Sequence, residues 1–254
     1  MAKIIALANQ KGGVGKTSTA VNLAAAFADL GKKVLLIDFD PQGNASTAFG
    51  VDKNQVGSSI YHLLSGRCSA EDCIVVPYPD YPHIIPATRD LSGAEIELVS
   101  EIGREFRLKE QMEGKAKDYD LILIDCPPSL GLLSLNAMVM ADEIFVPMPC
   151  EFLALEGLSQ LVDIVELTRR RLNPRLSIGG IIFTMFDNRS KLMRQVATEV
   201  EKYFVDKVFS TYIPRNIKVS ESQSFGKPLV WYDKKTKGAI AYSKLAAEIA
   251  DKRF

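Results

Sequence analysis

The sequence predicts an α/β fold, a doubly wound, mainly parallel sheet of about seven or eight strands with helices on both faces. Short runs of Val, Ile and Leu alternate along the chain with longer segments whose apolar residues recur at helical spacing. A glycine-rich turn joins the first apolar run to the first helical segment, and two later runs end in a carboxylate. This alternation is typical of parallel sheets, because each return to a parallel strand needs a crossover, usually a helix.

Length and composition restrict the class of protein. With 254 residues, 47% of them hydrophobic, the chain can bury one sizeable core, and we expect residues 1–254 to form a single domain. No stretch approaches the roughly 18 consecutive apolar residues that a membrane span needs, so we expect a soluble protein of the cytoplasm. We expect reduced thiols without a metal role, since no C-x-x-C pair occurs among Cys68, Cys73, Cys126 and Cys150.

The expected elements follow from apolar periodicity, with glycine and proline marking their ends. Gly31 is expected to end the first helix, and four prolines break the pattern between residues 51 and 90. The expected strands lie at about 3–8, 33–37, 73–76, 83–85, 121–125, 143–147 and 178–185, and the expected helices at about 16–30, 59–64, 131–140, 155–172, 191–204 and 239–253.

The turn between the first strand and the first helix reads NQKGGVGKTS from Asn9 to Ser18. Its glycines let backbone N–H groups converge on one anion, and the helix start adds partial positive charge. We expect Lys16 to reach the β- and γ-phosphates and Thr17 to offer its hydroxyl to magnesium. A tight turn without a ligand is the alternative, but a lysine in the first helical turn opposes the helix dipole and needs an anion to explain it.

Carboxylates follow the second strand and the strand near residue 121. Asp38 and Asp40 are two residues apart, so they project on the same side of an extended chain, next to the ligand crevice of an open sheet. The alternative for them is a solvated turn closed by Pro41 and Gly43. Asp125 ends a buried strand beside the expected phosphate loop, which is typical of a magnesium-binding carboxylate, and the alternative is a structural cap.

The loop departs from the general pattern G-x-x-x-x-G-K-[ST], because Gln10 stands at the first glycine position and Lys11 follows it. With this second lysine it resembles the deviant motif x-K-G-G-x-x-K-[ST] of the ParA/MinD class of P-loop ATPases. The similarity runs from the first strand to the last helix. Within this class, the rest of the chain resembles the chromosome-partitioning ParA/Soj branch more specifically. This resemblance implies that Lys11 crosses a dimer interface to the partner's nucleotide, that Asp40 orients or activates the attacking water, and that Asp38 supports magnesium or the loop.

The same resemblance implies a full set of site residues, with ATP and Mg²⁺ as cofactors. Lys11, Lys16 and Asp40 are the catalytic residues, and Thr17 and Asp125 are the magnesium ligands. A proline-containing loop near residue 214 is expected to pack on the adenine. The nucleotide contacts are expected at Lys11, Gly12, Gly13, Val14, Gly15, Lys16, Thr17, Ser18, Pro214 and Asn216.

Charge is unevenly distributed along a chain that is neutral overall. Residues 1–168 carry 13 basic and 23 acidic side chains, whereas residues 169–254 carry 18 and 8. A basic C-terminal third predicts a local face for nucleic acid or for an acidic membrane. The family resemblance places Arg189 and Lys218 on DNA, and a lysine at 218 would contact phosphate instead of a base edge. A solvated face is the alternative for either residue.

The resemblance implies an ATPase of chromosome or plasmid segregation. We expect an ATP-bound sandwich homodimer that binds double-stranded DNA without sequence preference on the nucleoid. Hydrolysis, stimulated by a ParB/Spo0J-type centromere-binding protein, would reset it.

Three alternatives remain at this point. A MinD-like ATPase that cycles on a membrane is disfavoured by the helix at 239–253, whose alanine-rich apolar side carries little bulk, so we expect it to pack onto the sheet. A metabolic ATP-dependent ligase or kinase lacks a visible second substrate pocket. An iron–sulfur carrier relative lacks a cysteine pair placed to bridge subunits.

Overall fold

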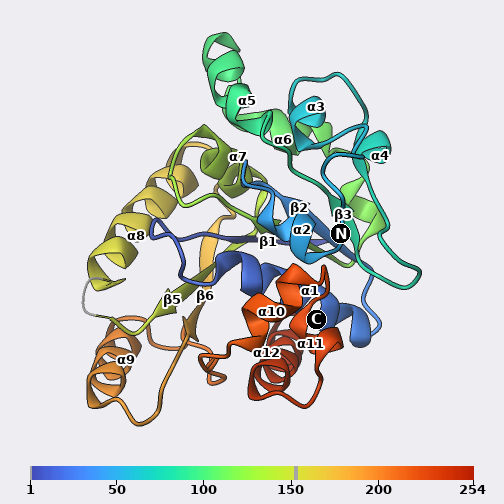
Figure 1. The fold of residues 1–254 in the computed structure, drawn as a ribbon. Coiled ribbons are helices and arrows are strands. Elements are labelled where there is room, and N and C mark those ends of the chain that lie inside the picture. The colour runs from blue at the N-terminus through green and yellow to red at the C-terminus, as the bar shows by residue number, and fades with distance from the viewer. Residues whose placement is uncertain (1, 152–153) are drawn as a thin grey trace.

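The computed structural model describes residues 2–151 and 154–254, and a parallel sheet lies at its centre (Figure 1). Six strands pair in the order β3-β2-β4-β1-β5-β6, and each pair runs parallel. The chain fills one edge of the sheet and then the other, which makes the sheet doubly wound and confirms the predicted fold class. The strands are β1 (Lys3–Leu7), β2 (Val34–Asp38), β3 (His83–Ile85), β4 (Leu121–Asp125), β5 (Glu143–Pro149) and β6 (Ser177–Thr184).

The prediction of about seven or eight strands is wrong for the described chain. The expected strand at 73–76 makes only one isolated bridge, Val75 to Ile84, in the antiparallel sense. Pro77 follows this segment directly, and proline has no N–H group with which to extend a ladder.

Helices cover both faces of the sheet, as predicted. Short 3-10 turns η1 (Leu98–Ser100), η2 (Arg104–Phe106) and η3 (Ala116–Asp118) join some of them. The α-helices are α1 (Lys16–Asp29), α2 (Asn44–Ala48), α3 (Ile60–Leu64), α4 (Ala70–Cys73), α5 (Leu91–Glu97), α6 (Arg107–Gln111), α7 (Leu132–Met140), α8 (Ala154–Arg171), α9 (Lys191–Tyr203), α10 (Lys218–Ser224), α11 (Leu229–Tyr232) and α12 (Lys237–Arg253).

Two apolar clusters result, one on each side of the sheet. Successive strand residues point to opposite faces, so Ile5 and Leu7 join the cluster of α1 and α12, whereas Ala6 joins the cluster of α7 and α8. Figure 1 shows α10, α11 and α12 gathered beside α1, away from α7 and α8. The carboxyl ends of the strands lie between these helical layers, where parallel open sheets place ligand sites.

The last helix, α12, lies within the fold. Its buried Tyr242, Leu245 and Ile249 join the apolar cluster of α1, and Arg253 at its end donates to Glu143 Oε2 at 2.8 Å. The apolar side of this helix is therefore covered, which confirms that it packs within the fold. Its neighbours include α1 and α11 in addition to the strands. No helix in the described ranges is long and apolar enough to cross a bilayer.

The cysteines fall into two groups. The sulfur atoms of Cys68 and Cys73 lie side by side, after the end of α3 and at the end of α4, whereas Cys126 and Cys150 are free and buried. The expectation of reduced thiols stays a prediction for the first pair.

Candidate nucleotide site

The phosphate loop, residues 9–15, joins β1 to α1 in a fixed conformation. Gly13 and Gly15 have φ values of 73° and 91°, a region that favours glycine because a side chain would meet the backbone. Thr184 Oγ1, at the end of β6, donates to Val14 O at 2.8 Å. β6, two strands away from β1 in the sheet, therefore holds the loop through this bond, and α1 starts directly after the loop.

The two lysines of the loop lie in different environments. Lys16 is 6% exposed, and its Nζ donates to Asn9 O at 3.1 Å and Lys11 O at 3.3 Å. Burial lowers the pKa of Lys16, while the nearby Asp125 raises it. Lys11 has a side chain 48% exposed, and its Nζ lies 2.6 Å from Glu151 Oε2. The structure thus places Lys16 inside the site and directs Lys11 to a carboxylate of its own chain.

The two carboxylates after β2 have separate surroundings. Asp38 is fully buried, and its Oδ2 accepts hydrogen bonds from the N–H and Oγ of Ser46 at 2.7 and 2.6 Å. Burial raises the pKa of Asp38 to about 6, and the Ser46 bonds oppose the shift. Asp40 accepts from Gln42 N at 2.9 Å and lines the cavity of the phosphate loop. Asp38 therefore fixes the loop, and Asp40 faces the ligand space.

Asp125 is the most unusual charged group of the site. It pairs in register with Asp38 of β2 and Leu7 of β1, so it stands where the phosphate loop begins. Both carboxylate oxygens are buried and lack a hydrogen-bond partner among residues 2–151 and 154–254. Burial first, and then the charge of Asp38, raise the pKa of Asp125 well above its ordinary value, while Thr17 and Lys16 oppose the shift. Unpartnered buried oxygens fit a divalent cation, which prefers oxygen ligands.

One cavity of about 620 Å³ collects most of the predicted phosphate contacts. Asp40 lies on its wall, as do two residues that the sequence did not indicate, Gln223 and Ser224 of α10. Gln223 Nε2 donates to Ser18 Oγ at 3.0 Å across 205 positions of sequence, a contact for which local patterns give no signal. The predicted residues on its wall are Gly12, Gly13, Gly15, Lys16, Thr17 and Ser18.

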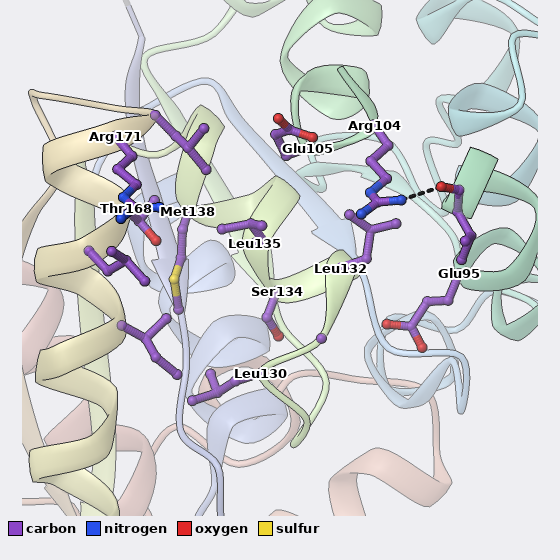
Figure 2. A pocket seen from close by; sticks show the side chains of 15 residues that line it. Glu95, Arg104, Glu105, Leu130, Leu132, Ser134, Leu135, Met138, Thr168 and Arg171 are labelled. Carbon is purple, nitrogen blue, oxygen red and sulfur yellow. Dashed lines mark hydrogen bonds between the residues drawn. The ribbon is translucent and has the colours of Figure 1, made fainter. Parts of the chain in front are cut away.

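A larger cavity of about 700 Å³ lies between α5, α7 and α8, and it is mainly apolar (Figure 2). Figure 2 shows Glu95 and Arg104 on the side opposite Arg171. The cavity shares the loop at residues 126–131 with the nucleotide site, because Pro128 lines the smaller cavity and Leu130 the larger one. No phosphate-loop residue is among its described lining residues, so its size does not make it the nucleotide site.

The predicted adenine contacts lie apart from the phosphate cavity. Pro214 lines a further cavity of about 340 Å³ with Asn188, Lys237 and Lys244. Asn216 Oδ1 accepts from the N–H of Lys218 at 2.9 Å, at the start of α10. Neither is among the described lining residues of the cavity that holds Lys16.

The two predicted DNA contacts are already ion-paired. Arg189, 90% exposed, donates to both carboxylate oxygens of Asp187 at 3.0 and 2.8 Å, and these bonds lower the pKa of Asp187 to about 2. Lys218 Nζ lies 2.8 Å from Glu221 Oε1. Exposed ion pairs of this kind contribute little to stability, so a phosphate can replace the carboxylate at small cost.

Known proteins resemble this chain over nearly its whole length. A family described as AAA domain matches residues 2–178. The sporulation initiation inhibitor protein Soj of Bacillus subtilis is 51% identical over 250 residues, which cover 98% of this chain and 99% of that protein. The chromosome partitioning protein ParA of Caulobacter vibrioides is 50% identical over 249 residues, 97% of this chain and 93% of that protein.

The fold has a close match among solved structures. Cobyrinic acid a,c-diamide synthase of Mycobacterium smegmatis, solved with an ATP analogue and magnesium, has a TM-score of 0.86 and 34% sequence identity, covering 98% of this chain and 95% of that one. Together with the identity of about half to Soj and ParA, the phosphate loop with two lysines and the doubly wound sheet place the chain in one family. The chain belongs to the ParA/Soj family of chromosome-partitioning P-loop ATPases.

Proposed function

We propose that residues 1–254 act as one MgATP-dependent DNA-partitioning ATPase, which pairs with a second copy when ATP is bound and then binds double-stranded DNA without sequence preference. The observation that carries this proposal is the meeting of three features in one place. They are the phosphate loop with buried Lys16, Asp40 on the same cavity wall, and the unpartnered carboxylate of Asp125. A lysine, two carboxylates and the backbone N–H groups of a glycine-rich loop together suit phosphoryl transfer.

Each residue has a role that its surroundings support. Gly12, Gly13 and Gly15 line the cavity, where their N–H groups would meet the phosphates, and Lys16, held by two backbone carbonyls, would neutralise the phosphate charge. Thr17 and Asp125 would hold Mg²⁺, which supplies charge neutralisation on the phosphate oxygens when bound. Binding such a cation also removes the cost of the buried Asp125 carboxylate.

Asp40 and Lys11 complete the site in different ways. Asp40 is exposed to the cavity and is free to orient or activate the attacking water. Lys11 is half-exposed and paired with Glu151 of its own chain, so it would exchange this exposed pair, at small cost, for the triphosphate of a second copy. Catalysis that depends on a partner's lysine is slow in the isolated subunit, which suits a nucleotide switch.

The DNA face lies on the basic C-terminal third. Asn188, next to Arg189, shares a cavity with Lys237 and Lys244 of α12, so several cations gather there. Each neutralised phosphate adds about 0.9 to the salt slope of log affinity for B-DNA. Two paired copies double these contacts, and the ATP-bound dimer therefore holds DNA at salt concentrations at which one subunit does not.

A ParB/Spo0J-type centromere-binding protein is the proposed partner that stimulates hydrolysis, and nucleoid association follows from DNA binding. The membership in the ParA/Soj family supports both assignments. Light scattering with ATP, ADP and no nucleotide tests the pairing. We expect twice the 28.0 kDa subunit mass with ATP alone, and a single-subunit mass under saturating MgATP would contradict the proposal.

A metabolic synthase is the second candidate, because one solved relative at 34% identity is a cobyrinic acid a,c-diamide synthase. The curated relatives at about half identity are partitioning proteins, which favours DNA partitioning. The two functions separate in one assay. DNA should stimulate ATP turnover or retain the ATP-bound protein, whereas a synthase would need a small carboxylate and a nitrogen donor for turnover.

A further inference from the structure

α10 joins the nucleotide cavity to one of the proposed DNA contacts. Gln223 and Ser224, at its end, line the cavity of the phosphate loop. Lys218, at its start, is a proposed DNA contact, and Asn216 Oδ1 accepts its backbone N–H. One helix of seven residues thus has its end at the phosphate-loop cavity and its start at a proposed DNA contact.

Gln223 connects this helix to the phosphate loop through one hydroxyl. Its Nε2 donates to Ser18 Oγ at 3.0 Å, and Ser18 lines the cavity beside Lys16 and Thr17. A serine hydroxyl has one O–H donor in addition to its acceptor lone pairs, so Ser18 can accept from Gln223 and donate to an anionic oxygen at the same time. Consecutive hydrogen bonds polarise one another, so a phosphate that accepts from the Ser18 hydroxyl would strengthen the hydrogen bond from Gln223 to Ser18.

The start of the helix carries a cation that has an internal partner. Lys218 Nζ lies 2.8 Å from Glu221 Oε1, and the hydroxyl of Tyr232 donates to the same oxygen at 2.6 Å. The position of Lys218 therefore depends on the orientation of α10 and on its packing against α11. If α10 is held at its far end, Lys218 occupies one position before DNA arrives.

We propose that α10 couples the nucleotide to the DNA face, with Gln223 as the positioning residue that senses the occupied phosphate loop through Ser18. The proposal rests on the proposed function and adds a regulatory route to it. Fixing a helix before binding reduces the conformational entropy lost on contact with DNA, so DNA affinity rises with nucleotide without any new base or phosphate contact. In this view pairing doubles the contacts, and α10 adjusts the strength of each.

The substitution Gln223→Ala tests this route. At saturating MgATP, with dimer mass verified, we expect DNA affinity to fall about fivefold, the size expected for one hydrogen bond, while affinity without nucleotide stays at its low value. Gln55→Ala is the matched control, because the Gln55 amide donates to Asp52 at 2.9 Å on an exposed turn outside the cavity lining. A variant with the wild-type ratio of ATP-state to nucleotide-free DNA affinity would overturn the proposal.

Hydrogen exchange of the α10 amides gives a second test that does not depend on DNA binding. We expect exchange across residues 218–224 to slow when MgATP is added to the wild type without DNA, and this protection to be lost in Gln223→Ala. Protection that persists in the variant, or none in the wild type, contradicts the coupling. Failure of the proposed function looks different, because the wild type itself would then bind DNA equally in ATP and ADP.

Discussion

The nucleotide cavity and the basic face hold their charges in opposite ways. Behind the cavity wall, the buried Asp125 has no hydrogen-bond partner among the described residues, and Lys16 on the wall bonds to backbone carbonyls in place of a carboxylate. On the basic face, Arg189 and Lys218 are exposed and each has a carboxylate partner. A ligand in the cavity therefore relieves buried charges, whereas DNA on the basic face only replaces one partner with another.

The difference fits the proposed coupling between ATP and DNA, which would be reciprocal, each ligand raising the affinity for the other by the same factor. Charges buried without partners cost free energy that a ligand recovers, so the cavity favours a tight complex. Exposed pairs contribute about 0–1 kcal/mol, so their exchange for phosphates yields little per contact. DNA affinity would then depend on the number of contacts, which the proposed ATP-bound pair would double.

Removal of the buried cation should give the largest effect. Lys16→Ala is expected to lower ATP affinity about a hundredfold or more, since truncating one member of a buried charged contact costs several kcal/mol, and to prevent pairing. Calorimetric titration with ATP measures it. Lys33→Ala, at an exposed lysine after α1, is the control, and unchanged ATP affinity in Lys16→Ala would remove the phosphate-loop assignment.

Loss of the water-facing carboxylate should affect turnover and leave binding intact. Asp40→Ala is expected to lower hydrolysis about a hundredfold or more, the usual contribution of a general base, and to accumulate as a DNA-bound dimer. Phosphate release measures the first effect, and gel shift with ATP measures the second. Asp52→Ala, which alters an exposed aspartate that also accepts a backbone N–H two residues on, should behave as wild type. Turnover at the wild-type rate in Asp40→Ala would refute the role.

The basic face should respond less strongly, because its cations are already paired. Arg189→Glu is expected to lower DNA affinity about tenfold at low salt and to reduce the salt slope, with the ATP-dependent dimer intact. Fluorescence anisotropy across a salt series measures both quantities. Arg175→Glu is the control. This exposed arginine lies near Asp142 at the amino-terminal ends of β5 and β6, whereas Arg189 follows the carboxyl end of β6. An unaltered affinity and slope in Arg189→Glu would count against this face.

The smallest expected effect is a gain in stability from Asp125→Asn, whereas most substitutions lower stability. The folded state raises the pKa of Asp125 above its unfolded value, so stability falls as pH rises above about 4, where the unfolded chain releases the proton first. Asp125→Asn removes that loss. We expect the nucleotide-free variant to melt about 2–4 °C higher at pH 7, with a smaller gain at pH 4. A lower melting temperature at pH 7 would show that the carboxylate is not a buried unsatisfied charge.

The phosphate loop and its two carboxylate segments could be predicted because their information is local. A buried strand, glycines at positions that need positive φ, and Lys16 in a first helical turn occur within a few residues. The register of Asp38 with Asp125 then follows from parallel pairing of adjacent strands. The structure adds that Asp38 is a buried support of the loop at Ser46, a distinction that strand alternation alone does not make.

The remaining site contacts join distant parts of the chain, and local patterns do not report them. Lys11 meets Glu151 across 140 positions, and Gln223 meets Ser18 across 205. Pairing of this kind depends on how α10 and the end of β5 fold back over the phosphate loop. The missing strand has a different cause, since the apolar run 73–76 satisfies strand periodicity while nearby prolines prevent a continuous ladder.

The salt dependence of DNA binding in three nucleotide states tests the central claim most directly. Wild-type protein should bind random-sequence duplex DNA tightly with MgATP and weakly with ADP or no nucleotide, and the slope of log affinity against log salt should be about twice as steep with ATP. Equal affinities and equal slopes in the three states would contradict the account of a nucleotide-controlled pair.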